Sequence, residues 1–96
     1  MPDENATRKD RFPIGKLVAT RGALAELTDD DILLALKRHA LGDWGDLNAF
    51  DEEQNELALA TGGRLFSVYL SATAIRFYVI TESDRSATTI LLPHEY

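Results

Sequence analysis

The sequence predicts a single α+β domain, with two or three helices packed on one face of a three- to four-stranded antiparallel sheet. Apolar residues between positions 28 and 61 recur at helical spacing, whereas those between 65 and 92 alternate with the period of a strand. Helices that precede a run of strands, instead of alternating with them, are typical of α+β domains. The chain has 96 residues, 45% of them hydrophobic and 27% charged, which fits one ordinary globular domain.

The N-terminal part predicts a tail, a strand and a short helix. Residues 1–12 are polar and of mixed charge, and we expect a disordered tail ahead of a folded domain at 13–96. The largely apolar segment 14–20 predicts a short strand. Residues 23–27 are Ala, Leu and Glu, which are strong helix formers, and they predict one or two helical turns.

A longer helix is predicted to follow Thr28 or Asp29, either of which can cap a helix N-terminus. Its apolar stripe has residues at i, i+1, i+4 and i+8: Ile32, Leu33, Leu36 and Ala40. Three basic residues in the last turn complement the helix dipole: Lys37, Arg38 and His39. Gly42 is a natural stop.

Beyond a tight turn at 42–46, another helix is predicted to begin at Asp46 or Asp51 and to end near Thr61, before two glycines. Its buried side should comprise the apolar residues Leu47, Phe50, Leu57 and Ala58.

The last third of the chain changes to a period of two. Segments 65–70 and 75–80 predict two strands joined by a hairpin at 71–73. After a polar loop at 82–86, residues 88–92 predict a third strand. This strand could be an open sheet edge, through which two copies of the chain would form a homodimer.

Negative charge is concentrated in one segment. The chain has 16 acidic and 10 basic residues, a formal net charge of −6. Residues 26–56 hold ten of the acids and two of the bases, so this segment alone carries −8. Helix initiation explains six of these acids, because carboxylates in a first turn each contribute about 0.3–1 kcal/mol: Asp29, Asp30, Asp31, Asp51, Glu52 and Glu53.

The same segment also supports a functional hypothesis, in which its carboxylates imitate a nucleic-acid backbone. Phosphates along one DNA strand advance by about 3.4 Å, and clustered carboxylates can approach that density. The partner would be a protein with a basic surface. The candidate contacts are Asp43, Trp44, Asp46, Asp51, Glu52, Glu53 and Glu56.

Trp44 has two interpretations. As the one tryptophan of the chain, it could plug the gap where two helices meet, because its large side chain buries much area. Alternatively, it could be an exposed hot spot for a partner.

Two further groups of residues could carry chemistry. His39, Asp43 and Asp46 could converge on a metal, but Gly42 separates them and zinc needs further ligands in defined geometry. The loop residues Glu82, Asp84 and Arg85 could bind a polar ligand or perform acid–base work. Their structural interpretation is an Asp–Arg pair that holds the turn.

Other reaction classes lack their residues. The chain has no cysteine, which excludes disulfides, thiolate nucleophiles and cysteine zinc sites. It also has no Gly-x-Ser-x-Gly and no phosphate-binding glycine loop. We therefore expect no enzyme activity, no metal and no cofactor.

The sequence also suggests where the protein resides. The N-terminus, Met1-Pro2-Asp3, lacks the apolar region of a signal peptide. No apolar run approaches the roughly 20 residues that span a bilayer. We expect a cytoplasmic protein without a membrane partner.

Several stretches together resemble small bacterial proteins labelled "plasmid-related protein". They cover residues 14–96 and include Gly42-Asp43-Trp44-Gly45-Asp46-Leu47, Ile80-Thr81-Glu82, Asp84-Arg85-Ser86, Thr88-Thr89-Ile90-Leu91-Leu92-Pro93 and Glu95-Tyr96. The resemblance implies bacterial origin and carriage on mobile elements, and it transfers no catalytic residue. The chain departs from this group at Phe77-Tyr78, where such proteins often carry a tryptophan.

Three functions compete on these grounds. The first is a non-enzymatic interaction protein of a mobile element, such as a DNA-mimic inhibitor of a restriction or CRISPR nuclease, which would not itself bind nucleic acid. The second is an RNase toxin of the helix–helix–meander (RelE-like) type, although residues 57–96 balance at three acids and three bases where such an enzyme must hold phosphates. The third is a structural or self-associating domain.

Overall fold

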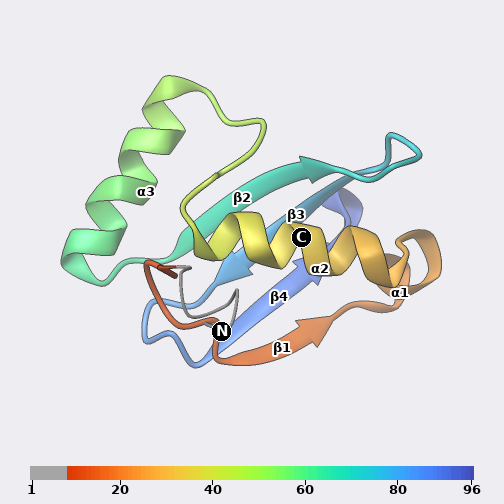
Figure 1. The fold of residues 1–96 in the computed structure, drawn as a ribbon, viewed down its shortest axis with the longest axis horizontal. Helices are drawn as coiled ribbons and strands as arrows, with labels where there is room; N and C mark the ends of the chain where they lie inside the picture. The colour runs from red at the N-terminus through yellow and green to blue at the C-terminus, as the bar shows by residue number, and fades with distance from the viewer. Residues whose placement is uncertain (1–8) are drawn as a thin grey trace, which may run out of the picture.

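The computed structural model describes residues 9–96, which form a four-stranded sheet and three α-helices (Figure 1). The α+β class is as predicted. In chain order the elements are β1 (Lys16–Ala19), α1 (Arg21–Glu26), α2 (Asp29–Ala40), α3 (Ala49–Thr61), β2 (Leu65–Leu70), β3 (Arg76–Thr81), β4 (Ala87–Leu91) and the 3-10 helix η2 (Pro93–Glu95).

The sheet differs from the prediction in the direction of one strand. Its order is β1-β4-β3-β2; β2, β3 and β4 form an antiparallel meander, while β1 pairs parallel to β4. The sheet is therefore mixed, and β4, predicted to be an open edge, lies between β1 and β3. Side-chain periodicity defines a strand but not its direction or neighbours, which depend on how α1 and α2 return the chain across the sheet (Figure 1).

Helix α2 begins as its sequence predicts. Thr28 is the N-cap: its hydroxyl accepts from the Asp31 N–H at 3.1 Å, and the Asp31 carboxylate accepts from the Thr28 N–H at 3.0 Å. The same carboxylate accepts from the Ala72 N–H at 3.0 Å, which ties α2 to the β2–β3 loop. These backbone donors, that of Thr28 first, lower the pKa of Asp31.

The buried stripe of α2 is rotated from the predicted one. It comprises Ile32, Ala35, His39 and Ala40. Leu33, predicted to be buried, is 63% exposed. His39, predicted to be a last-turn cation, is completely buried instead.

Helix α3 begins between its two predicted starts, with Asn48 as the N-cap, and ends at Gly62 in the left-handed conformation. Its predicted buried side is wrong in two positions, because Phe50 is 66% and Leu57 56% exposed. These residues are exposed because α3 lies against the outer edge of β2 and not on the face of the sheet (Figure 1). The rest of the protein therefore covers only a small part of the helix surface.

Two apolar clusters form the core of the described part of the chain. The main one joins α1 and α2 to the sheet: Ala23, Leu27, Ile32, Ala35, Tyr69, Phe77, Val79, Ile90 and Leu92. The second lies below α3: Phe12, Trp44, Ala58 and Leu65. Phe12 falls inside the predicted tail, yet it is buried, and the Arg11 N–H donates to the Ala40 carbonyl at 2.8 Å. The fold therefore includes Arg11 and Phe12, while residues 1–8 of the predicted tail lie outside the described part.

Candidate functional site: the α3 surface and a buried histidine

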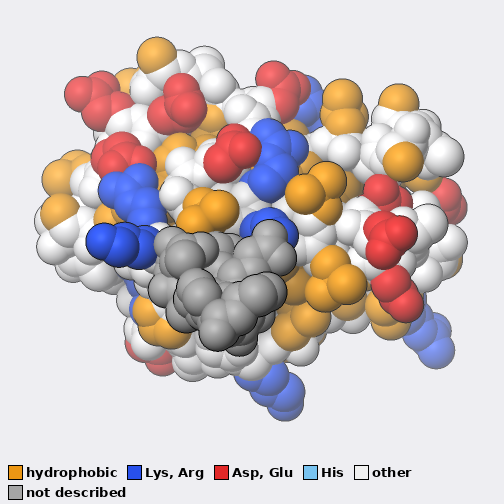
Figure 2. Space-filling view, viewed as in Figure 1, with side chains coloured by type: hydrophobic (Ala, Val, Ile, Leu, Met, Phe, Trp, Pro, Cys, Tyr) orange, Lys and Arg blue, Asp and Glu red, His pale blue; other side chains and the backbone are white. Residues whose placement is uncertain are grey.

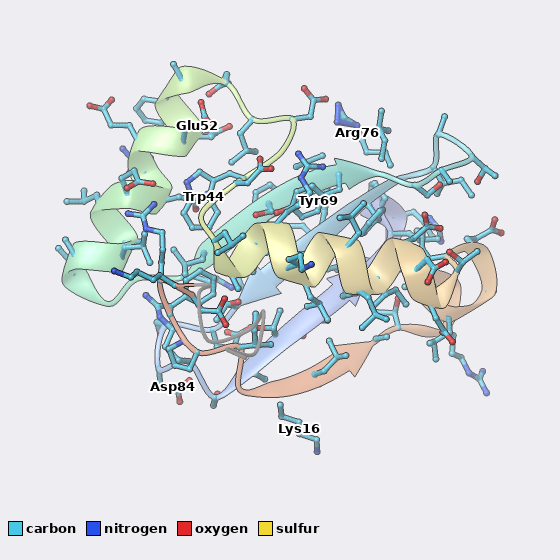
Figure 3. The ribbon with its side chains drawn as sticks, viewed as in Figure 1. Lys16, Trp44, Glu52, Tyr69, Arg76 and Asp84 are labelled. Atoms are coloured by element: carbon cyan, nitrogen blue, oxygen red, sulfur yellow. The ribbon has the colours of Figure 1, made fainter. Side chains whose placement is uncertain are left out.

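Trp44 is the central side chain of the region between α3 and the sheet (Figure 3). It is 2% exposed and stacks against Phe12, with the His39 ring edge-on. Its indole N–H donates to Glu56 Oε2 at 3.0 Å. The indole therefore fills a gap, as its structural interpretation predicts, and its ring is not available as a surface contact.

The turn that contains Trp44 closes the outer edge of β2. The Asp46 N–H donates to the Val68 carbonyl at 2.8 Å, and the Val68 N–H donates to the Trp44 carbonyl at 3.2 Å. Gly45 has a φ of 76°, and a Cβ there would overlap the Val68 carbonyl oxygen. The glycine is thus required by a close backbone approach.

Asn55 of α3 closes the next position of this edge. Its amide nitrogen donates to the Phe66 carbonyl at 2.7 Å, and its amide oxygen accepts from the Phe66 N–H at 3.1 Å. A buried amide thus replaces a neighbouring strand.

We expect Asn55→Leu to lower the free energy of unfolding by about 2 kcal/mol, because both Phe66 backbone groups lose their partner. Gln54→Leu is the matched control, since Gln54 is exposed one residue away, and it should change stability by less than about 0.5 kcal/mol. Urea unfolding measures both, and equal losses would contradict the role given to Asn55.

Three of the predicted contact acids are ion-paired. The shortest distance from a carboxylate oxygen to a guanidinium nitrogen is 2.7 Å between Asp43 and Arg38. It is 2.9 Å between Asp46 and Arg76, and 2.7 Å between Glu56 and Arg11. The Arg38 and Arg11 guanidinium groups, as hydrogen-bond donors, lower the pKa of Asp43 and of Glu56. Within the described residues, the charge of these acids is therefore largely balanced by arginine.

The remaining contact acids belong to α3. Among residues 9–96, Asp51, Glu52 and Glu53 form no ion pair. Glu53 lies between Phe50 and Leu57 at helical spacing i, i+3, i+7, so the three share one outward face. We call these three residues the α3 stripe, together with the exposed Glu52, which borders their face on the side of Glu53. Asp51 instead lines a hollow with Arg64 and Phe66.

The acidic side chains do not form one continuous surface in the view of Figure 2. One group lies over α3 and a second over the start of α2, and acids between them sit beside blue basic side chains. Helix initiation accounts for the second group, which comprises Asp29, Asp30 and Asp31.

His39 lies in a buried chain of hydrogen bonds that sequence analysis missed. Its Nδ1 is 2.6 Å from Ser67 Oγ, and its Nε2 is 2.9 Å from Thr81 Oγ1, which lies 2.7 Å from Thr88 Oγ1. The Thr88 hydroxyl donates to the Ile14 carbonyl at 2.7 Å. The only sequence signal was a polar residue at a core position of α2.

The positions of the protons in this series of hydrogen bonds follow from its last acceptor, the Ile14 carbonyl. A carbonyl only accepts, so Thr88 donates to Ile14 and accepts from Thr81, which in turn accepts from His39 Nε2–H. His39 Nδ1 therefore accepts from the Ser67 hydroxyl. Burial, helped by the charge of Arg85, lowers the pKa of His39 to about 4, so the ring is neutral near pH 7.

The Ser67–His39 pair resembles a nucleophile and its base, but it is sealed. Both residues are completely buried, and the rings of Phe12 and Trp44 pack against His39. Nucleophilic catalysis requires that the serine reach a substrate. This arrangement is instead a satisfied polar network inside the core.

The loop after β3 is held by separate contacts, and not by an Asp–Arg pair. Arg85 donates to the carbonyls of Gly63 at 2.5 Å, Glu82 at 3.1 Å and Ala58 at 3.2 Å. Asp84 accepts from the Ser86 N–H at 2.9 Å, and the Ser86 hydroxyl and N–H lower its pKa. Arg85 thus joins this loop to the C-terminal end of α3, where the Ala58 carbonyl also accepts from the N–H groups of Gly62 and Gly63.

Comparisons with protein families, curated proteins and solved structures give no significant match to this chain. Over residues 9–96, no helix is long and apolar enough to cross a membrane. In the same part of the chain, no three His, Cys, Asp or Glu side chains gather as a metal site.

Proposed function

We propose that this protein is a non-enzymatic interaction module that binds a partner protein through the α3 stripe. The supporting observation is that α3 buries only Asn55 and Ala58, while it exposes Phe50 and Leu57 beside carboxylates that form no ion pair within residues 9–96. Large apolar side chains with charges around them are typical of interface hot spots and their rims.

The chemistry of the α3 stripe defines its partner. Glu52 and Glu53 require lysine or arginine opposite them, and Phe50 and Leu57 require an apolar pocket on one side of those basic residues. The buried side of α3 is fixed to β2 by the hydrogen bond from the Asn55 amide to the Phe66 carbonyl, and its C-terminal end is fixed by the hydrogen bond from Arg85 to the Ala58 carbonyl. A preorganised helix of this kind loses little conformational entropy on binding.

Inhibition of a host defence nuclease is the more specific version of this proposal. A net charge of −6 and the resemblance to plasmid-related proteins support it. The nucleic-acid mimicry is restricted here to α3, since Asp43, Asp46 and Glu56 are paired with arginines. The apolar residues of α3 would add contacts that a phosphate backbone does not make. An RNase toxin has less support, because it must hold phosphates with basic residues and residues 57–96 balance at three acids and three bases.

The test uses immobilised protein and a nuclease-treated bacterial lysate, followed by purified restriction and CRISPR effectors. We expect the variant Phe50→Ser/Glu53→Lys to weaken binding of the recovered partner by about tenfold or more. Both residues are exposed, so the free energy of unfolding should change by less than about 0.5 kcal/mol. DNA cleavage by a bound effector, with and without the protein, then reports inhibition.

The matched control is Asp30→Lys, which reverses one exposed charge of the other acidic group, as Glu53→Lys does in α3. It should retain the partner. Loss of binding in this control but not in the α3 variant would move the contact to the start of α2 and contradict the proposal.

A further inference from the structure

The two edges of the sheet differ in how their backbone groups are satisfied. Asn55 and the turn at 44–46 close the outer edge of β2. No strand among residues 9–96 pairs with the outer edge of β1. Natural proteins protect or pair such an edge, because an open one is a template for another strand.

The outer edge of β1 offers its hydrogen-bonding groups at defined residues. The N–H of Lys16 donates to the carbonyl of Ser86, just before β4, and the N–H of Thr20 donates to the carbonyl of Ile90 in β4, each at 3.0 Å. Because the direction alternates along a strand, Leu17 and Ala19 present their N–H and C=O groups outward. The side chains of Leu17 and Val18 are 46% and 39% exposed, on opposite faces.

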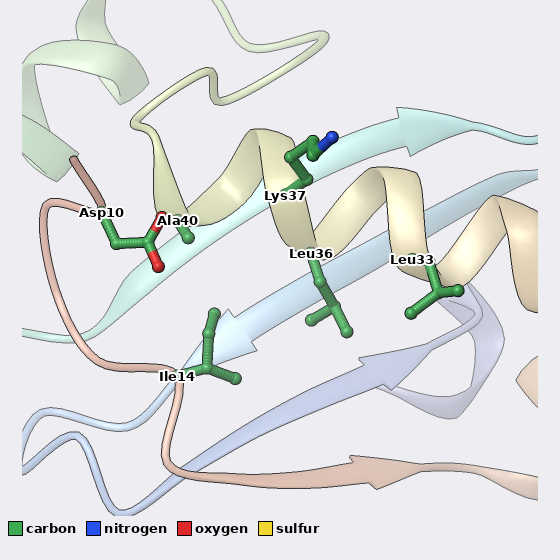
Figure 4. A pocket seen from close by; sticks show the side chains of 6 residues that line it. All are labelled: Asp10, Ile14, Leu33, Leu36, Lys37 and Ala40. Carbon is green, nitrogen blue, oxygen red and sulfur yellow. The ribbon is translucent and has the colours of Figure 1, made fainter. Parts of the chain in front are cut away.

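Helix α2 leaves the β1 side of the sheet partly uncovered. A hollow of about 290 Å³ lies between α2 and the segment that enters β1 (Figure 4). Its apolar lining is Ile14, Leu33, Leu36 and Ala40. The open edge is therefore bordered by apolar surface, which favours a protein neighbour over water.

We propose that β1 pairs antiparallel with β1 of a second copy, about a two-fold axis at Val18. In this register the outward groups meet, because Leu17 of each copy lies opposite Ala19 of the other and can exchange both backbone hydrogen bonds. Val18 lies opposite Val18 of the second copy. Lys16 lies opposite Thr20, so the two lysines are kept apart.

The same register brings opposite charges together. The Thr20 hydroxyl donates to Glu95 at 2.5 Å, which holds that carboxylate beside the end of β1. Lys16, Val18 and Thr20 share one face of the strand. The exposed ammonium of Lys16, which projects from β1 in Figure 3, therefore falls beside Glu95 of the second copy, twice by symmetry. This complementarity favours a second copy over an unrelated strand.

The distribution of charge over the whole molecule also favours this edge. The acidic α3 contacts β2, at the opposite end of the sheet order from β1. Pairing through β1 therefore keeps the two α3 helices of a dimer far apart, which limits repulsion between two chains of net charge −6.

Sedimentation equilibrium and two substitutions at Lys16 test the dimer. The wild type should have twice the mass of the 10.7 kDa chain. Lys16→Glu should raise the dimer dissociation constant by about tenfold or more, because it places carboxylates together. Lys16→Arg and the α3 variant Phe50→Ser/Glu53→Lys should remain dimeric. A monomeric wild type, or a dimer that Lys16→Glu does not weaken, would overturn the proposal.

The register has its own test, because the chain has no native cysteine. Val18→Cys should form a disulfide-linked dimer on mild oxidation, since directly opposed positions lie within disulfide reach. Lys16→Cys, on the same face, should not form this disulfide. In the proposed register Lys16 lies opposite Thr20 of the second copy, which is four residues along the strand from that copy's Lys16. Cross-linking of Lys16→Cys in place of Val18→Cys would refute the register.

If deletion of residues 1–8 turned a monomer into a dimer, the chain's own N-terminus would occupy the edge, which also overturns the proposal.

Discussion

Trp44→Ala is expected to lower the free energy of unfolding by about 3–5 kcal/mol, the usual cost of truncating a large buried aromatic. The indole is 2% exposed and contacts Phe12 and His39. Its removal leaves a cavity in the second core cluster and deprives Glu56 of a donor. Urea unfolding followed by circular dichroism measures the loss.

Two variants separate the contributions at this position. Trp44→Phe keeps most of the volume and loses the hydrogen bond, so it should cost less than alanine. Phe50→Ala removes an aromatic that is 66% exposed, and it should cost less than about 0.5 kcal/mol. Equal losses for Trp44→Ala and Phe50→Ala would show that Trp44 does not hold α3 to the sheet.

Acid should destabilise the fold through His39 before the carboxylates titrate. The pKa of His39 is about 4 in the folded chain, against an ordinary value of 6.5 for a histidine in the unfolded chain. As the pH falls below 6.5, the unfolded chain binds a proton that the folded chain does not, so stability is lost. The loss is complete near pH 4 and amounts to about 3 kcal/mol.

Urea unfolding between pH 7 and 5 isolates this effect. Native hydrogen bonds lower the pKa of acids such as Asp31 and Glu95 from ordinary values of 3.8 and 4.5, so these acids lose their stabilisation mainly below that window. His39→Gln should abolish the slope there, although it lowers stability at every pH. His94→Gln, at an exposed histidine, should keep it. A slope that survives His39→Gln would assign the acid sensitivity to another group.

Partner binding through the α3 stripe and dimerisation through β1 are compatible with each other. A dimer joined through β1 would present one α3 stripe at each end of an eight-stranded sheet. A partner with two basic sites could then bind both stripes, with an avidity above the affinity of either. The proposals remain separable, because Lys16→Glu acts on the dimer and Phe50→Ser/Glu53→Lys acts on the partner.

Much of the candidate site was not predictable, and particular residues show why. Asp43 and Asp46 looked like free charges in a turn, because Arg38 and Arg76 reach them only after α2 and β3 are in place. His39 looked like an exposed cation, because its partners Ser67 and Thr81 lie 28 and 42 residues away. Phe50 and Leu57 looked like core residues, because apolar character alone does not say whether a neighbour covers them.

The sequence by itself determined the local features of this protein. The Thr28 cap, the Gly62 stop and the alternation in β2 and β3 each arise from interactions between residues close in the chain, so local patterns predict them. The parallel pairing of β1, the exposure of α3 and the burial of His39 were decided by tertiary structure alone. They depend on which elements meet across long sequence separations, and a local period carries no information about that.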